Sequence, residues 1–417
     1  MGTNNKFTYY GTYAPLPVRL VNAIARQSKP GFNKLITLEA DKLLRTAKRK
    51  TGLSDWGNPS FKEALNTLLN SVEQEGKLTF FGRFTIKQFL VDNLCNRLNI
   101  NETLTRFPQI QEQAITKPIF VTGWYRTGTT YLHNLLASHP KLKAPLYWEL
   151  RTPYPDTESG QINERKIIRE LNLINRIHAY LAPGFSTAHA MYAEKPEECL
   201  HLFENALSGT TAFVISEAKS YAWWLLNQDM HDSYAFYKLQ LQLLNWQRPG
   251  HPWVLKWPYH LWHLDTLLDV FPDATIIHIH RDPCEAIPSV CSLSALARSS
   301  FVESIDTTAL GKFWLEYSSA GLQRGLQARK RIAQNQIIDV RYTDLKTNPK
   351  AVMQKILQKM DLERDEDWIN SIGEPDKNRQ RKQKTAHQYS LSQFGLNETE
   401  IREHFALYIH EFDLTRL

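Results

Sequence analysis

The turn at residues 123–130 has a spacing that can bind phosphate. Gly123 and Gly128 form the GxxxxG pattern of a phosphate-binding loop, between a short apolar run and a predicted helix. A nucleotide hydrolase has Lys and then Ser or Thr directly after the second glycine, but Thr129 and Thr130 stand there. Arg126 provides the cation instead, two residues before Gly128. Because a Mg²⁺-nucleotide needs that lysine on its β- and γ-phosphates, we expect a different anion here.

A second pair of residues indicates further phosphate ligands. Arg281 ends the apolar run ATIIHIH, and Ser289 follows eight residues later, about two turns into the next segment. An arginine at a strand end can bind phosphate through two parallel N–H groups, and a nearby hydroxyl can complete the same shell. Taken singly, the two residues also fit a surface ion pair with Asp282 and an ordinary helix residue.

Both patterns lie where short apolar runs alternate with helical segments. From residue 118 onward the sequence contains IFVT, WVLK, ATIIHIH and IIDVRY, each followed by a segment with helical spacing. This alternation is typical of a parallel sheet with crossover helices. We therefore expect an α/β protein with a P-loop-like three-layer fold around a central parallel sheet.

Helical sequence surrounds the predicted sheet. Residues 1–115 are predicted to be a helical N-terminal region, and residues 116–417 the P-loop-like domain. Within that domain, residues 161–247 form a predicted helical insertion rich in Trp and Tyr, on the acceptor side. The basic run NRQRKQK, residues 378–384, lies in a predicted mobile lid at 375–395, although a solvated linker also explains the run.

Composition favours a globular cytoplasmic protein. The 417 residues are 42% hydrophobic, which is ample for a core. They contain neither a run of 18 apolar residues for a membrane span nor a signal-peptide apolar region at the N-terminus. The four scattered cysteines show no disulfide or metal spacing, so a reducing cytosol is expected. Although the formal charge is +7, Lys and Arg are spread along the chain, which argues against nucleic acid as a partner.

Five motifs in order resemble one enzyme family. They are GWYRTGTTYLHNLL, LKWPYHLWHLDTLLDVFPDATIIHIHRDP, the Arg281 to Ser289 spacing, VRYTDLKTNP and HQYSLSQFGL. Together they resemble the sulfotransferases that use 3′-phosphoadenosine-5′-phosphosulfate (PAPS), in particular the branch with an Arg-Thr-Gly-Thr-Thr loop. The resemblance covers roughly residues 116 to 412, and the helical leader before them is similar to that branch as well.

The resemblance assigns a co-substrate and its ligands. It implies that PAPS is bound without a metal and leaves as 3′-phosphoadenosine-5′-phosphate (PAP). Arg281 and Ser289 are implied to hold the 3′-phosphate, and Arg381 and Lys382 are further cofactor ligands on the lid. The 5′-phosphosulfate is implied to lie on Arg126, Thr127, Gly128, Thr129 and Thr130. Arg126 keeps the cation that many relatives supply with Lys and adds a bidentate fork, so it also counts among the catalytic residues.

Sulfuryl transfer to a hydroxyl needs a base on the acceptor and positive charge at the leaving oxygen. Lys256, at the end of WVLK, resembles a lysine that contacts the sulfuryl group and the leaving oxygen in relatives. Glu149, in APLYWEL, resembles the catalytic glutamate of tyrosylprotein and heparan-type sulfotransferases, although it also fits a helix-start carboxylate.

Histidines remain rivals for the base, because the cytosolic small-molecule branch uses one. His201 in EKPEECLHLFENAL is the main alternative, whereas His133 fits a packed helix residue better. Glu197 and Glu198, in the same motif as His201, either face the acceptor or cap the helix that follows Pro196.

The acceptor is expected to be a small molecule with hydrophobic or aromatic parts, sulfated on a hydroxyl or an amine. Its cavity would be lined by tryptophans that fit the protein core equally well, namely Trp223, Trp224, Trp246, Trp253, Trp257 and Trp262. Two other functions stay open at this point: a P-loop kinase or NTPase, and a non-catalytic binding protein on a sulfotransferase scaffold. Neither the acceptor nor the oligomeric state can be identified from the sequence.

Overall fold

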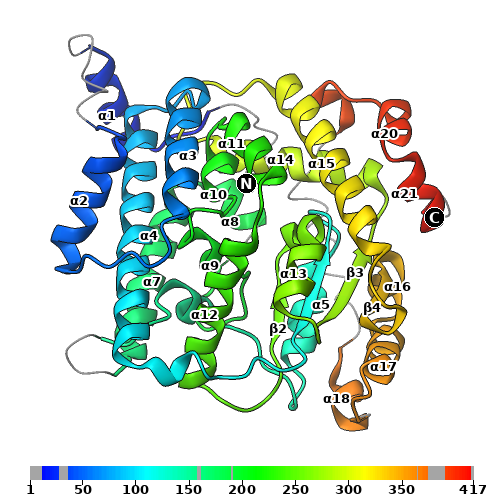
Figure 1. Ribbon diagram of the computed structural model, residues 1–417. Helices are drawn as coiled ribbons and strands as arrows, with labels where there is room; N and C mark the ends of the chain where they lie inside the picture. Colours follow the sequence, from blue (N-terminus) through cyan, green and yellow to red (C-terminus); the bar gives the residue numbers. More distant parts are fainter. Residues whose placement is uncertain are drawn as a thin grey trace, which may run out of the picture.

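A parallel β-sheet forms the centre of the protein. The computed structural model describes residues 12–27, 36–156, 161–188, 191–363, 365–373 and 390–414. Within these residues the sheet has the strand order β2-β1-β3-β4, and all neighbouring strands are parallel (Figure 1). The strands are β1 (Ile119–Gly123), β2 (Val254–Lys256), β3 (Thr275–His280) and β4 (Ile337–Arg341). They coincide with the four predicted apolar runs, because a parallel strand covered on both faces is apolar throughout.

Alternate residues of the strands enter two separate cores. Phe120, Leu255 and Ile276 lie in a large core together with the N-terminal helices and the insertion. Their neighbours Val121 and Ile277 lie in a second core on the opposite face, with helices that follow β1 and β4. The sheet is therefore covered on both faces, which confirms the predicted three-layer α/β fold.

Helices that connect or follow the strands complete these layers. They are α5 (Thr129–Ala137), α6 (Tyr147–Arg151), α13 (Leu264–Val270), α14 (Pro283–Arg298), α15 (Thr307–Arg329), α16 (Tyr342–Thr347), α17 (Pro349–Lys359), α18 (Glu366–Ser371), α20 (Glu398–His404) and α21 (Ala406–Glu411). The strand order reverses between β1 and β3, since β2 lies on one side of β1 and β3 on the other. Ligands of such sheets bind at the carboxyl ends of the strands at this reversal.

The described N-terminal residues are mainly helical. Their helices are α1 (Leu16–Gln27), α2 (Ala40–Thr51), α3 (Phe61–Glu75) and α4 (Phe80–Arg106). The long helix α4 begins at Thr79, whose hydroxyl accepts a hydrogen bond from the Gly82 N–H and so caps the helix. Residues of α2, α3 and α4 belong to the same core as Phe120 of the sheet.

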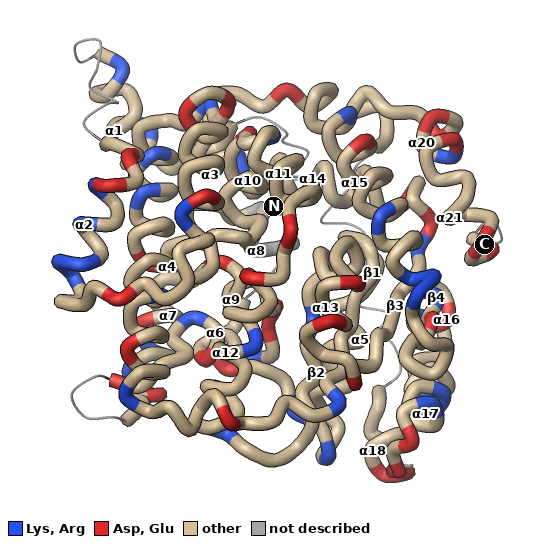
Figure 2. Tube along the Cα trace, in the orientation of Figure 1, with Lys and Arg blue, Asp and Glu red and all other residues tan. Residues whose placement is uncertain are grey.

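Most of the described residues between 161 and 247 are also helical. They are α7 (Glu164–Leu181), α8 (Pro183–Ala188), α9 (Leu200–Glu204), α10 (Thr211–Ile215), α11 (Lys219–Asn227) and α12 (His231–Gln247). None of the described helices has both the length and the apolar composition that a membrane span needs. In Figure 2, basic and acidic residues are interspersed over the described elements.

Candidate active site

The turn between β1 and α5 has the geometry of an anion-binding loop. Gly128 adopts φ 95°, and a Cβ atom at this position would lie 2.7 Å from the ring of Tyr342, so only glycine fits. Arg126 also adopts a positive φ, 66°, which is uncommon for a residue other than glycine. The hydroxyl of Thr127 donates to the Trp124 carbonyl at 2.7 Å and closes the turn. Thr127 is fully buried, and its hydroxyl is committed to the turn.

Backbone N–H groups converge at this turn. Within the described part of the chain, the N–H groups of Thr127, Gly128, Thr129 and Thr130 donate to no protein acceptor. Those of Thr129 and Thr130 open α5, where the helix dipole adds partial positive charge. Four adjacent N–H donors at a helix start make a site for an anionic oxygen cluster.

The structure brings Arg126, Arg281 and Ser289 together. Arg126 Nε donates to Ser289 Oγ at 3.1 Å, although the two residues are 163 positions apart. Arg281 Nη1 donates to the carbonyl of Arg126 at 2.6 Å. Ser289 is buried on α14, and Arg281 directly follows β3. The predicted second phosphate-binding pair thus lies against the first loop, at the reversal between β1 and β3.

Arg281 has two further neighbours. Its guanidinium forms an ion pair with Glu285 at 2.8 Å, and it lies 4.4 Å from the ring centroid of Tyr342. Tyr342 therefore packs between Arg281 and Gly128 of the loop. Tyr342 is not among the residues predicted from the sequence, although its position directly after β4 is a signal, because residues after parallel strands reach the ligand edge.

A buried lysine lies beside the loop on β2. Lys256 is fully buried, and its Nζ donates to Thr130 Oγ1 at 3.2 Å and to Glu198 Oε1 at 2.5 Å. Glu197 lies 4.0 Å from the same Nζ. Lys256 is therefore not a surface lysine. The Lys256 ammonium group lies between Thr130, at the end of the loop, and the Glu198 carboxylate. A cation in this position can stabilise negative charge that develops on an oxygen during a group transfer.

Comparisons with known proteins agree with this geometry. The model of the sulfotransferase family matches residues 118–367. The crystal structure of sulfotransferase STF1 from Mycobacterium tuberculosis H37Rv is similar with a TM-score of 0.77 and 31% sequence identity, over 88% of this chain and 98% of that one. The chain belongs to the sulfotransferase family.

Other relatives support the same family. Sulfotransferase STF9 from Mycobacterium avium has a TM-score of 0.77 and 26% identity, over 91% of this sulfotransferase and 97% of that chain. Omega-hydroxy-beta-dihydromenaquinone-9 sulfotransferase Stf3, from Mycobacterium bovis and from Mycobacterium tuberculosis, is 25% identical over 258 residues. That alignment spans 59% of this chain and 63% of the length of these curated relatives.

Glu149 does not lie beside Lys256 in this sulfotransferase. Its carboxylate accepts from the Leu146 N–H at 2.7 Å, which caps α6, and pairs with Arg248 at 3.0 Å. Burial raises the pKa of Glu149, while the charge of Arg248 opposes the shift. The predicted base is thus engaged in fixing its own helix to the end of α12, and Glu198 occupies the position next to the buried lysine.

The two histidines differ in their surroundings. His133 is buried on α5, its Nε2 lies 3.1 Å from the Val254 carbonyl, and burial lowers its pKa to about 3. A neutral imidazole bonded to the strand fits a packed helix residue, as the sequence indicated. His201 lies in the first turn of α9, where its backbone N–H donates to the Glu198 carbonyl at 3.4 Å, and it remains close to the cluster.

Helices α20 and α21, with Phe405 between them, pack against residues next to both Arg126 and Arg281. Phe405 stacks on Trp124, the second residue of the loop, with ring centroids 4.8 Å apart. The Tyr408 hydroxyl lies 3.2 Å from His280 Nδ1, and a backbone hydrogen bond from Arg281 opposes the burial that raises the pKa of Tyr408. These aromatic residues are not among those predicted from the sequence, because their helical spacing is equally typical of ordinary core.

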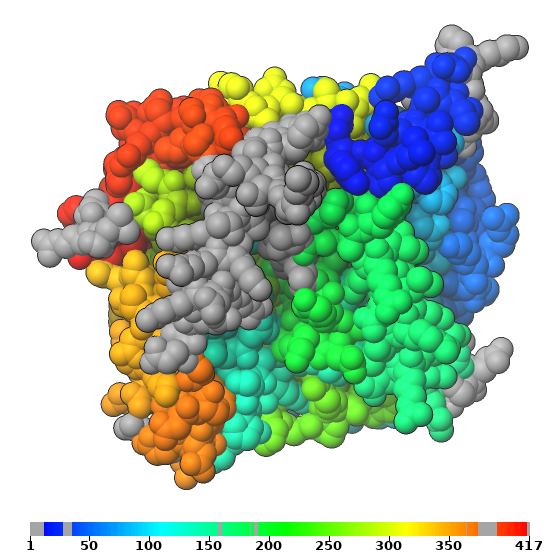
Figure 3. Space-filling view, turned by 180° about the vertical axis from the view of Figure 1, so that it is seen from behind, coloured from blue at the N-terminus to red at the C-terminus, as the bar shows by residue number. Residues whose placement is uncertain are grey.

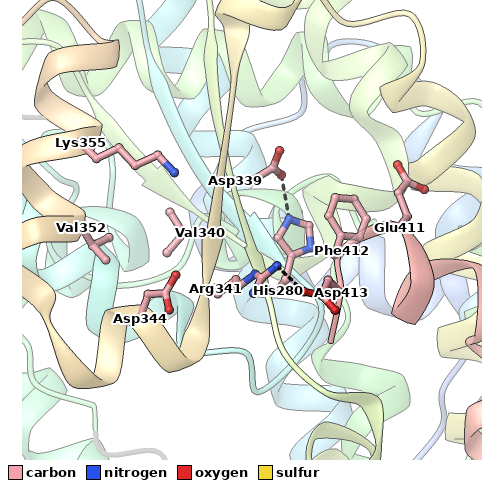
Figure 4. A pocket seen from close by; sticks show the side chains of 10 residues that line it. All are labelled: His280, Asp339, Val340, Arg341, Asp344, Val352, Lys355, Glu411, Phe412 and Asp413. Atoms are coloured by element: carbon pink, nitrogen blue, oxygen red, sulfur yellow. Dashed lines mark hydrogen bonds and ion pairs between the residues drawn. The ribbon is translucent and has the colours of Figure 1, made fainter. Parts of the chain in front are cut away.

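His280 belongs to a buried polar network behind Arg281. Its Nε2 donates to Asp339 at 2.7 Å, and Arg329 bonds both Asp339 and His278. Burial alone would raise the pKa of Asp339, but the hydrogen bonds from His280 and Arg329 lower it overall. Figure 4 shows His280 between Asp339 and the ring of Phe412, at a pocket of about 280 Å³. Because the Arg329 guanidinium is bonded to both Asp339 and His278, we assign this cluster a structural role.

The predicted tryptophans separate into two groups. Trp253, Trp257 and Trp262 are buried in the core, which confirms the core alternative for them. Trp223 and Trp224 are half-buried and line a pocket of about 730 Å³ between α3, α4, α11 and α12. Trp246 packs on Phe107 in a smaller cluster. The predicted ligands Arg381 and Lys382 lie outside the described residues, as does most of the predicted lid.

Proposed function

We propose that this protein transfers a sulfuryl group from PAPS to a hydroxyl, or an amine, of a small lipid-like or aromatic acceptor. The observation that carries the proposal is the meeting of Arg126, Arg281 and Ser289 at four unbonded N–H groups. Two separate anion-binding elements at one place fit a donor that has phosphate at both its 3′ and 5′ positions. Membership of the sulfotransferase family argues against the kinase alternative.

The residues present fit PAPS without a metal. Backbone N–H groups of residues 127–130 and the Arg126 side chain would hold the 5′-phosphosulfate, since preorganised donors at a helix start suit an anion. Arg281 and Ser289 would hold the 3′-phosphate. PAPS would supply the sulfuryl group and leave as PAP.

Lys256 and Glu198 would act at the two oxygens of the transfer, Lys256 at the leaving oxygen and Glu198 at the acceptor hydroxyl. Lys256 is bonded to Thr130 at the end of the loop, so its ammonium can meet the charge that develops on the leaving oxygen. Glu198 lies on the far side of that ammonium and could take the proton from the acceptor hydroxyl. We therefore transfer the role of base from Glu149 to Glu198 and keep His201 as the alternative.

The nature of the acceptor is supported by the relatives. The curated relatives are named for an omega-hydroxy-dihydromenaquinone, whose sulfated position is a hydroxyl on a lipid. We infer that the acceptor here is likewise an alcohol with a large apolar part. The four cysteines are free thiols, which supports our proposal that the protein is located in the reducing cytoplasm.

Calorimetry with PAP tests the donor site. PAP should bind equally well with and without EDTA, and ATP should bind much more weakly because it lacks a 3′-phosphate. An acceptor screen that detects sulfated products by mass then tests the reaction. Absence of PAP binding, or binding that EDTA abolishes, would overturn the proposal, and PAP binding without any sulfated product would leave the non-catalytic alternative.

A further inference from the structure

Helix α1 exposes an apolar stripe to solvent. Leu16, Leu20, Val21 and Ile24 are between 42% and 63% exposed, and their spacing places them on one side of the helix. The opposite side is buried through Val18, Asn22 and Ala25. Asn22 accepts a hydrogen bond from the Phe81 N–H of α4 at 3.0 Å, which fixes the helix with its apolar side outward.

Helix α7 has the same character. Leu173, Ile174, Ile177 and Tyr180 are between 43% and 59% exposed at positions i, i+1, i+4 and i+7, so they form one outward stripe. Leu171 is the buried residue among the described residues of this 18-residue helix. The apolar side of an amphipathic helix is normally buried, whereas these four side chains of α7 are about half exposed.

The two stripes lie next to each other on one face. The Tyr13 N–H, just before α1, donates to the Ser299 carbonyl at 2.9 Å. The adjacent Ser300 hydroxyl donates to the carbonyl of Leu181, the last residue of α7. One turn after α14 therefore anchors both helices. Figure 3 shows α1 in dark blue directly above the green surface formed by the region of α7.

Basic residues surround these stripes. Among the residues of α1 and α7, six are cations and two are acids. The cations are Arg19, Arg26, Arg165, Lys166, Arg169 and Arg176, and the acids are Glu164 and Glu170. Exposed apolar side chains flanked by Lys and Arg are the pattern of helices that lie in the interface of an anionic membrane.

We propose that the face formed by α1 and α7 docks on an anionic lipid bilayer. The two helices lie parallel to the surface, the apolar stripes enter the acyl boundary, and the six cations contact lipid phosphates. A protein partner would bury the apolar stripes equally well, but the excess of cations over acids favours an anionic surface.

The docked face is also connected to the acceptor side of the site. The chain leaves α7 through α8 and continues to Glu197 and Glu198, which flank Lys256. If the proposed sulfuryl transfer is correct, docking would present the base to alcohols dissolved in the bilayer. This last step rests on the proposed function, whereas docking itself does not.

Vesicle sedimentation of the full chain tests docking. Vesicles of phosphatidylcholine with about 30% phosphatidylglycerol should bind the protein, and neutral vesicles or about 1 M salt should weaken binding at least about tenfold. Ile24→Ser combined with Ile177→Ser removes one exposed side chain from each stripe and should lower binding at least about tenfold. Leu407→Ser, at a residue of α21 that is 78% exposed, is the matched control and should bind like the wild type.

A charge variant separates electrostatic from apolar binding. Arg169→Gln combined with Arg176→Gln should lower binding to anionic vesicles by roughly fivefold per residue, whereas Lys312→Gln on α15 should not. Absence of vesicle binding by the wild type, or equal binding of all variants, would overturn the proposal. A dimer in analytical ultracentrifugation that the Ile24→Ser/Ile177→Ser variant dissociates would instead assign the face to a second copy. PAP calorimetry on each variant keeps this outcome apart from failure of the donor site.

Discussion

Replacement of Glu198 by glutamine tests the central contact of the site. Glutamine keeps the shape of the side chain but removes the negative charge that lies 2.5 Å from Lys256 Nζ. If Glu198 takes the proton from the acceptor, kcat should fall by roughly 10² to 10⁴, equivalent to about 3 to 5 kcal/mol of activation free energy. PAP affinity should stay within about twofold, because the phosphate ligands are on other elements.

The variant should also have a lower free energy of unfolding, and the contacts that Lys256 keeps limit this decrease. Breaking a buried ion pair costs about 3 to 5 kcal/mol when the remaining charge has no partner. Lys256 keeps Glu197 at 4.0 Å and Thr130 at 3.2 Å, and Glu198 itself is partly exposed. We therefore expect a decrease of about 1 to 2 kcal/mol in the free energy of unfolding, which denaturant titration can measure.

The assay needs three variants in parallel. Steady-state kinetics with saturating PAPS should show a large loss of kcat for Glu198→Gln only. Glu149→Gln should keep kcat within a few-fold, although it loses the ion pair with Arg248 and up to about 1 kcal/mol of stability. A Glu198→Gln protein with normal kcat, together with an inactive Glu149→Gln or His201→Ala protein, would refute the assignment and return the role to the original candidates.

Four further predictions concern binding and stability. Arg281→Ala should remove most of the preference for PAP over ATP in calorimetry, at roughly 1.5 to 3 kcal/mol per lost charge-assisted contact. Glu285→Gln should raise PAP affinity up to about fivefold, because it releases Arg281 from its ion pair. Equal PAP and ATP affinities in the wild type would contradict the premise of both predictions, which is that Arg281 binds the 3′-phosphate. Tyr408→Phe should weaken PAP binding a few-fold without changing KM for the acceptor, and an unchanged PAP affinity would show that α21 only packs. The free energy of unfolding should fall as the pH drops below about 6.5, because burial lowers the pKa of both His133 and His260 to about 3 and the unfolded chain then binds protons that the native state does not. Thermal or urea unfolding at pH 5 should show a loss of about 2 kcal/mol per histidine relative to pH 7. An unfolding free energy that stays constant between pH 7 and pH 5 would refute this account.

The sheet and the anion-binding residues were predictable because their signals are local. Each strand is a short apolar run with a polar or glycine residue at its end, so the sequence places Arg126, Lys256 and Arg281 at the ligand edge. The periodicity of 161–247 predicts helices for the same reason. Such signals require no knowledge of how distant segments pack.

Glu198, which we propose as the base, could not be singled out in this way. Glu149 and Glu198 both follow short connections near the sheet, and their roles depend on contacts made by the insertion. Arg248, at the end of α12, pairs with Glu149, while the Cys199 N–H donates to the Lys256 carbonyl and so fixes Glu198 beside the lysine. These contacts join residues about 60 to 100 positions apart, which neither spacing nor composition encodes.

The placement of α20 and α21 has a consequence for biosynthesis. Ribosomes make these two helices after every other described element of the donor site, yet Phe405 and Tyr408 contact Trp124 of the loop and His280 beside Arg281. A nascent chain can pair β1 with β3 and bury the sheet before these braces exist. Affinity for the donor should therefore appear only near the end of synthesis. A truncated chain could resist proteolysis and still fail to bind its co-substrate.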